Sequence, residues 1–116
     1  MKVYCFDVDE TLTCSAGPIT RDMLYDLRTE HTIGICGNFA KATHEWSDWA
    51  EIFSFIGPML MTKEQFLDQL KRYVPCEEVV MVGNIYGVTG RSDDKGAAAR
   101  ASVRFISEKN FANGQR

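Results

Sequence analysis

The sequence contains no long apolar segment and no recognisable export signal. None of its apolar runs approaches the roughly 18 residues that a helix needs to cross a bilayer. The chain enters a strand-like segment directly after Met1 and Lys2, without the basic region and apolar core of a signal peptide. We therefore expect a cytoplasmic protein with no membrane partner. Internal repeats and low-complexity segments are also missing, so neither competes with a globular fold.

Residues typical of a zinc site are scarce and scattered. The chain has two histidines, and its four cysteines contain no CxxC pair, which argues against bound zinc. Cys5 and Cys36 fall in segments that read as buried strands, so four free thiols are favoured over two disulfides. Free thiols agree with a reducing cytoplasm. The four cysteines are Cys5, Cys14, Cys36 and Cys76.

Neither sign of charge is in large excess. The net charge is −3, with 45% hydrophobic and 25% charged residues, a composition typical of globular proteins. Nucleic acid is not indicated as a partner, although net charge alone excludes neither nucleic acid nor membrane. At 116 residues, the chain is long enough for one domain with a real core and too short for a substantial second one.

Apolar runs of strand length alternate with helical patterns along the chain. Continuous apolar stretches predict buried strands, and apolar positions three or four residues apart predict helices. We expect Thr20 to cap the first helix, and Thr62 with Gln65 to form a capping box on the third. The predicted strands are residues 2–8, 32–36, 53–56, 79–82 and 103–106. The predicted helices span 20–29 and 39–53, open at 62, and run from 93 or 94 through 101.

This alternation predicts an α/β fold. The predicted strands are too apolar for a sheet with one face in water, so helices must cover both faces. We therefore expect a three-layer α/β/α architecture around a five-stranded parallel, Rossmann-like sheet. A single domain is expected over residues 1–106, followed by a loose tail over residues 107–116.

Polar residues collect where the predicted strands end. In open parallel sheets, ligands bind in the crevice beyond the carboxyl ends of the strands. Close carboxylates repel one another unless a cation, water or hydrogen bonds compensate them. We therefore expect a ligand site at this edge of the sheet. The residues at or just past the strand ends are Asp7, Asp9, Cys36, Gly37, Lys63 and Asn84.

Two acids two residues apart can divide the labour of phosphate chemistry. Asp7 is suited to attack as a nucleophile, and Asp9 to carry a proton to the leaving group. Mg²⁺ suits such an all-oxygen site, because it reduces the repulsion between an anionic nucleophile and a phosphate. Thr11 can orient the acid and Lys63 can offset the remaining charge. The alternatives are a turn residue for Thr11 and a solvated lysine for Lys63.

The segment "DVDET", residues 7–11, resembles the first motif, DxDx[TV], of the haloacid dehalogenase-like phosphatases. The resemblance implies that Asp7 forms an aspartyl-phosphate intermediate and that Asp9 is the general acid and base. It further implies Mg²⁺ bound by the Asp7 side chain and the Asp9 backbone carbonyl. A phosphorylated substrate is the expected partner.

Three further segments are similar to the later motifs of this family, in the same order. "IGICGN", residues 33–38, looks like the phosphate-binding second motif, with Cys36 in the place of the usual Ser or Thr and Gly37 and Asn38 in the loop. "MTKEQFLDQLKRY", residues 61–73, makes Lys63 the family lysine. "VVMVGN" and the later "DDKGAAARASVRFI" resemble the fourth motif, with Asp94 as its second acid and Asp93 as the alternative.

Two departures from the family pattern support a second hypothesis. Asn84 stands where the family usually has a metal-binding Asp, and Cys36 is a weaker donor than a hydroxyl. The metal ligands implied are therefore Asp7, Asp9, Asn84 and Asp94, with Asp93 as a candidate to replace the missing charge. A catalytically weak or inactive domain with a binding or regulatory role is the alternative to a phosphatase.

The gaps between the motifs are too short for an inserted cap domain. An uncapped site is open, which suits a phosphate at the end of a macromolecule or a small substrate enclosed by another subunit of a homo-oligomer. A phospho-acceptor domain of the response-regulator type is less favoured. Such domains carry the accepting Asp after the third strand, and residues 53–57 contain none.

Overall fold

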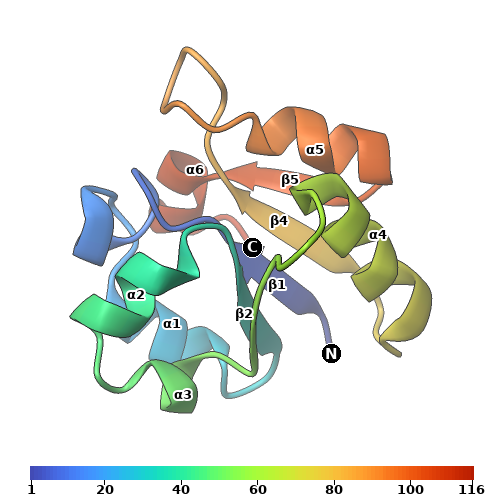
Figure 1. Ribbon diagram of the computed structural model, residues 1–116. Helices are drawn as coiled ribbons and strands as arrows, with labels where there is room; N and C mark the ends of the chain where they lie inside the picture. The colour runs from blue at the N-terminus through green and yellow to red at the C-terminus, as the bar shows by residue number, and fades with distance from the viewer.

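The computed structural model describes all 116 residues and is built on one five-stranded sheet. All neighbouring strands are parallel, in the order β3-β2-β1-β4-β5; Figure 1 labels four of them, β2, β1, β4 and β5. The strand order reverses between β1 and β4, so the crevice expected for a ligand lies at the carboxyl ends of these two strands. The strands are β1 (Val3–Phe6), β2 (Thr32–Cys36), β3 (Phe55–Gly57), β4 (Val79–Gly83) and β5 (Arg104–Ser107).

At least one helix follows each strand, and the two N-caps expected from the sequence are present. The Thr20 hydroxyl accepts a hydrogen bond from the Met23 N–H, and Thr62 and Gln65 form the predicted capping box. No helix is long and apolar enough to cross a membrane. The helices are α1 (Arg21–Leu27), α2 (Phe39–Glu45), α3 (Trp49–Ile52), α4 (Lys63–Tyr73), α5 (Asp94–Ala101) and α6 (Glu108–Ala112), with a short 3-10 turn, η1, at Thr13–Ser15.

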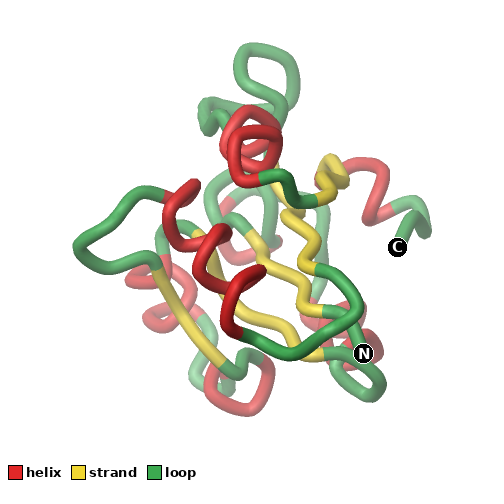
Figure 2. Tube along the Cα trace, turned by 90° about the vertical axis from the view of Figure 1, so that its right-hand side faces the viewer, coloured by secondary structure: helices red, strands yellow, loops and turns green.

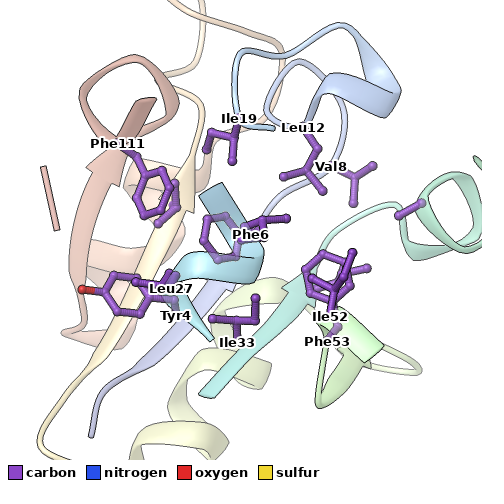
Figure 3. Close-up of a cluster of buried hydrophobic side chains, with 14 of the residues drawn as sticks. Tyr4, Phe6, Val8, Leu12, Ile19, Leu27, Ile33, Ile52, Phe53 and Phe111 are labelled. Atoms are coloured by element: carbon purple, nitrogen blue, oxygen red, sulfur yellow. The ribbon is translucent and has the colours of Figure 1, made fainter. Parts of the chain in front are cut away.

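Alternate side chains of the strands enter two separate cores. Tyr4 and Phe6 face the larger core with α1, α2, α3 and α6, which Figure 3 shows. Val3 and Cys5 face the smaller core with α4 and α5. Helices therefore cover both faces of the sheet (Figure 2), and the predicted three-layer α/β/α fold with an all-parallel sheet is confirmed. Fully buried strands explain why the apolar runs could be read directly as strands.

The predicted single helix over residues 39–53 is wrong. It is two short helices, α2 and α3, because Trp46 adopts an extended backbone with φ −112° and ψ 101°. This break lets the Trp46 ring stack on Phe53, with ring centroids 6.5 Å apart. Both side chains are more than nine-tenths buried. Burial of the two aromatic rings therefore outweighs continuation of the helix.

The predicted loose tail over residues 107–116 is also wrong. Ser107 ends β5 and caps α6 by accepting a hydrogen bond from the Asn110 N–H. The fully buried Phe111 ring lies edge-on to Phe6, with centroids 5.2 Å apart. The Arg116 guanidinium lies 3.8 Å from the centroid of the Phe111 ring. One deeply buried aromatic side chain thus fixes the C-terminal segment to the larger core.

We predict that Phe111→Ala lowers the free energy of unfolding by about 3 to 5 kcal/mol, because it removes a buried ring and leaves a cavity. Urea denaturation measures the change. Tyr73→Ala is the matched control, since that aromatic residue is 74% exposed and its loss should change stability by no more than about 0.5 kcal/mol. Equal effects of the two substitutions would show that residues 107–112 do not belong to the core.

Candidate active site

A lysine ammonium lies between two buried carboxylates at the carboxyl edge of the sheet. Lys63 Nζ is 3.0 Å from Asp7 Oδ1 and 2.7 Å from Asp94 Oδ1. The Asp7 and Asp94 side chains are 3% and 0% exposed. The structure therefore brings together three residues that the sequence identified separately, and they come from the end of β1 and the first turns of α4 and α5.

Two glycines make room for these carboxylates. A Cβ at Gly37 would overlap Asp7 Oδ1, and a Cβ at Gly83 would overlap Asp94 Oδ2. Asp94 Oδ2 instead accepts a 2.8 Å hydrogen bond from the backbone N–H of Asn84. Glycine at positions 37 and 83 therefore lets the backbone at the ends of β2 and β4 lie closer to the two acids than a residue with a side chain would allow.

Burial and mutual charge shift the pKa values within this cluster. Burial, reinforced by the negative charge of Asp7, raises the pKa of the Asp94 carboxyl to about 7, although Lys63 acts to lower it. Burial lowers the pKa of the Lys63 ammonium, but the carboxylates of Asp7 and Asp94 outweigh it and the net shift is upward. Lys63 is therefore a fixed positive charge at neutral pH, whereas Asp94 exchanges a proton near neutrality.

Two buried oxygen atoms at this edge have no hydrogen-bond partner. They are Asp7 Oδ2 and Asn84 Oδ1, and they come from the adjacent strand ends of β1 and β4. Buried acceptors without a donor are costly, and both are ligands that a hard cation such as Mg²⁺ prefers. No group of three or more His, Cys, Asp or Glu side chains is arranged to hold a metal ion. A cation here would be bound by these two oxygens together with water.

Asn84 also holds the loop that follows β1. Its side-chain Nδ2 donates a 3.1 Å hydrogen bond to the Glu10 carbonyl. Glu10 has a positive φ of 58°, a conformation that is uncommon for residues other than glycine. The amide of Asn84 therefore supports a strained turn with its nitrogen and leaves its oxygen free for a ligand.

Asp9 is exposed, and its carboxylate is held by two polar side chains. Its Oδ1 accepts a 2.6 Å hydrogen bond from Ser15 Oγ, and Asn38 Nδ2 lies 3.2 Å and 3.3 Å from its two carboxylate oxygens. The buried Thr11 hydroxyl donates to the Asp9 backbone carbonyl at 3.3 Å. Thr11 therefore fixes the backbone of the acid and not its carboxylate.

The three predicted residues of the second-motif segment differ in what they can offer a ligand. The Cys36 thiol is fully buried in the smaller core, where burial raises its pKa to about 12, so it remains a neutral thiol at neutral pH. The Gly37 N–H already donates to the Gly57 carbonyl at 2.9 Å. By contrast, the N–H groups of Val8, Asp9 and Asn38 make no hydrogen bond within the chain and remain available to phosphate oxygens.

Asp93, the alternative fourth-motif acid, lies outside the cluster. Its carboxylate accepts a hydrogen bond from the Gly96 N–H, caps α5, and lies 3.5 Å from Arg100. Its side chain is 54% exposed, so it does not supply the charge that Asn84 lacks. Asp94 is the first residue of α5 and lies at the edge of the sheet, whereas Asp93 is the N-cap of this helix and is exposed to solvent. Of the two neighbouring acids, Asp94 is therefore the one that belongs to the cluster.

A cavity of about 480 Å³ opens beside Asp9. Part of its lining comes from the loop between β4 and α5, whose Ser92 Oγ lies 3.4 Å from Lys63 Nζ. Sequence reasoning missed these contributors, because no motif marks them and the loop conformation alone brings them here. The lining residues are Asp9, Glu10, Ser15, Ala16, Arg91 and Ser92.

Comparisons with known proteins add no assignment: no family model, curated protein or solved structure matches this chain. The fold class is therefore established by the parallel sheet itself. A function has to be argued from the residues at its carboxyl edge.

The raised pKa of Asp94 predicts a pH-dependent stability. The folded pKa of about 7 exceeds the unfolded value of about 3.9, so between these pH values the folded state binds more protons and its stability falls as the pH rises. Asp94→Asn stays neutral and removes this decline. Relative to the native protein, the variant should gain about 2 to 4 kcal/mol in free energy of unfolding from pH 4 to pH 7.

Urea titrations in chelator-treated buffer at several pH values measure this gain. Asp93→Asn is the matched control, because it changes the adjacent, exposed acid and keeps a capping side chain. Its stability should run parallel to that of the native protein over the same range. A parallel course for Asp94→Asn as well would contradict the assigned pKa.

Proposed function

We propose that this protein is a Mg²⁺-dependent phosphatase that acts through an aspartyl-phosphate on Asp7. The observation that carries the proposal is the state of the Asp7 carboxylate: Oδ1 is paired with Lys63, while Oδ2 is buried without a partner, as is Asn84 Oδ1 after the neighbouring strand. Asp7 Oδ1 is thus neutralised by the ammonium of Lys63. Asp7 Oδ2 is left as an unpaired oxygen that a bound metal ion could accept as a ligand.

The residues that would hold Mg²⁺ are Asp7 and Asn84, with Asp94 close by through Lys63 and the Asn84 N–H. Bound there, the ion would reduce the repulsion between the carboxylate and the incoming phosphate. The all-oxygen ligand set and its position at the reversal of strand order fit such an ion. The resemblance of "DVDET" to the first motif of the haloacid dehalogenase-like phosphatases supports the same assignment.

The first half-reaction transfers the phosphoryl group to the protein. Asp7 Oδ1 attacks phosphorus, and the bond from phosphorus to the ester oxygen breaks. Asp9, in its protonated form, gives a proton to that leaving oxygen. Lys63 moves its hydrogen bond from Asp7 to a phosphoryl oxygen, and the free N–H groups of Val8 and Asn38 stabilise the charge that develops there.

The second half-reaction returns Asp7 to its carboxylate form. A water molecule attacks phosphorus, the Asp9 carboxylate takes one of its protons, and the bond between phosphorus and Asp7 Oδ1 breaks. One ester and one water thus give one alcohol and one phosphate. Asp9 is exposed and lines the cavity. In the proposed reaction the leaving group departs and the water enters through this cavity, which agrees with the role of Asp9 as acid and base.

We predict that the protein hydrolyses p-nitrophenyl phosphate in the presence of Mg²⁺ and stops when EDTA is added. Asp7→Asn should lower kcat by about 10³-fold or more, because an amide is a poor nucleophile. Asp93→Asn, which changes an acid outside the cluster, should keep most of the activity. Release of p-nitrophenolate measures all three rates, and equal rates for the native protein and Asp7→Asn would refute the proposal.

A specific observation favours a second candidate function, a binding module with a weak metal site. Asn84 contributes no charge, and the thiol in the place of the phosphate-binding hydroxyl, Cys36, is buried. Such a module would bind phosphorylated ligands without turnover. It differs from the phosphatase in one measurable respect: whether p-nitrophenyl phosphate is consumed by the native protein.

We predict that Asn84→Asp tightens Mg²⁺ binding by about tenfold, because a carboxylate adds a charge to the site. The same change should destabilise the Mg²⁺-free protein by about 1 to 3 kcal/mol, since it loses the hydrogen bond to the Glu10 carbonyl. Calorimetric titration and urea denaturation measure the two effects. Asn110→Asp, at an exposed position on α6, is the control, and unchanged Mg²⁺ affinity in Asn84→Asp would place the ion elsewhere.

A further inference from the structure

The cavity beside Asp9 contains one charged side chain without a partner, that of Arg91. Its guanidinium makes no hydrogen bond and no ion pair in the structure; only its backbone N–H is engaged, by Glu10 Oε1 at 3.3 Å. A guanidinium offers five N–H donors in a planar fork that matches carboxylate and phosphate groups. Arg91 is therefore equipped to bind an anion at the wall of this cavity.

The two carboxylates of the cavity accept hydrogen bonds from neutral groups. The Asp9 carboxylate is held by Ser15 and Asn38, and Glu10 accepts the backbone N–H of Arg91. Neither carboxylate forms an ion pair, so the guanidinium of Arg91 is the one cation of the lining and is engaged by neither acid. An anionic group that enters the cavity can pair with Arg91, and this attraction has to exceed the repulsion from the two acids.

The loop that carries Arg91 is fixed at both ends and in its middle. The Thr89 hydroxyl accepts from the Ile85 N–H at 2.8 Å and donates to the buried carboxylate of Glu108 at 3.1 Å. Ser92 accepts from Lys63, so the loop is tied to the Asp7 cluster as well. Figure 1 shows this loop projecting from the sheet between β4 and α5. The backbone of Arg91 is consequently held in place before any ligand arrives, which reduces the entropic cost of ordering the loop on binding.

We propose, on the basis of the phosphatase activity proposed above, that the substrate carries a second anionic group besides the phosphoryl group and that Arg91 binds it. The phosphoryl group lies at Asp7 and Lys63, and the rest of the substrate passes Asp9 into the cavity of about 480 Å³. The second group is a carboxylate or a further phosphate, both of which suit a guanidinium fork. Arg91 thereby sets which phosphate esters the open site accepts.

Three phosphonates of matched length test this assignment, because they lack the P–O ester bond that the proposed reaction breaks. Pentylphosphonate ends in a methyl group, 5-phosphonopentanoate in a carboxylate and 4-aminobutylphosphonate in an ammonium group. Isothermal titration calorimetry in Mg²⁺ gives the Kd of each, and homologues with chains of three to six carbons cover the unknown spacing. We expect the best carboxylate compound to bind about 10- to 100-fold more tightly than its methyl counterpart.

Arg91→Gln should weaken the carboxylate compound to the level of the methyl compound and leave the methyl compound unchanged. Arg28→Gln is the matched control: it removes the same charge from an exposed arginine that forms no ion pair and follows α1, and it should change none of the three affinities. Equal affinities across all lengths, tighter binding of the ammonium compound, or equal weakening of all compounds in Arg91→Gln would overturn the proposal.

This experiment separates the two proposals. A preference for the carboxylate compound that disappears in Arg91→Gln, in a protein that hydrolyses no phosphate ester, would support the anion site and refute the phosphatase. Hydrolysis of p-nitrophenyl phosphate without any preference among the phosphonates would do the reverse.

Discussion

The ion pair of Lys63 with two buried carboxylates is the interaction on which the rest of the site depends. Without its ammonium, Asp7 and Asp94 would face each other unpaired in a region shielded from water, at a cost of several kcal/mol. With it, one oxygen of each acid is paired, and the other Asp94 oxygen is held by the Asn84 N–H. The second oxygen of Asp7 alone is left without a partner, which makes it the natural position for a ligand.

The topology of the sheet explains why distant parts of the chain can build this cluster. Because β1 lies between β2 and β4, the residues after all three strands meet at one edge, and α4 and α5 cover the same face. Their first residues, Lys63 and Asp94, therefore point toward the end of β1 from neighbouring helices. A charge cluster spread over the sequence is thus held by a rigid scaffold of backbone hydrogen bonds, which keeps its side chains in place more precisely than a loop would.

Much of the fold and half of the site could be predicted from the sequence, and the errors have physical causes. The strands were readable because parallel strands buried on both faces are continuously apolar, and the predicted strand at residues 32–36 matches β2 exactly in its bounds. Asp7 and Lys63 could be expected at this edge from the strand ends, whereas Asp94 was preferred over Asp93 only through the resemblance of its segment to a family motif. The position of Arg91 beside the cavity could not be expected, since only the conformation of its loop brings it there. The Trp46 break and the anchoring of Phe111 were missed because tertiary packing, not local pattern, decides them.

The amide side chain of Asn84 has two uses at this site that a carboxylate could not combine. In the absence of a bound cation, Asp7, Asp94 and Lys63 leave the cluster with one net negative charge when both acids are ionised. A third carboxylate would double that charge and place an anion against the Glu10 carbonyl, which now accepts a hydrogen bond from the side-chain nitrogen of Asn84. An amide keeps the oxygen that a cation needs and the donor that the strained turn at Glu10 needs. In the proposed phosphatase, the amide would exchange cation affinity for stability of the cation-free fold, so the affinity for an anionic substrate would come more from fixed positive charges of the chain itself, Lys63 at the centre and Arg91 at the wall of the cavity.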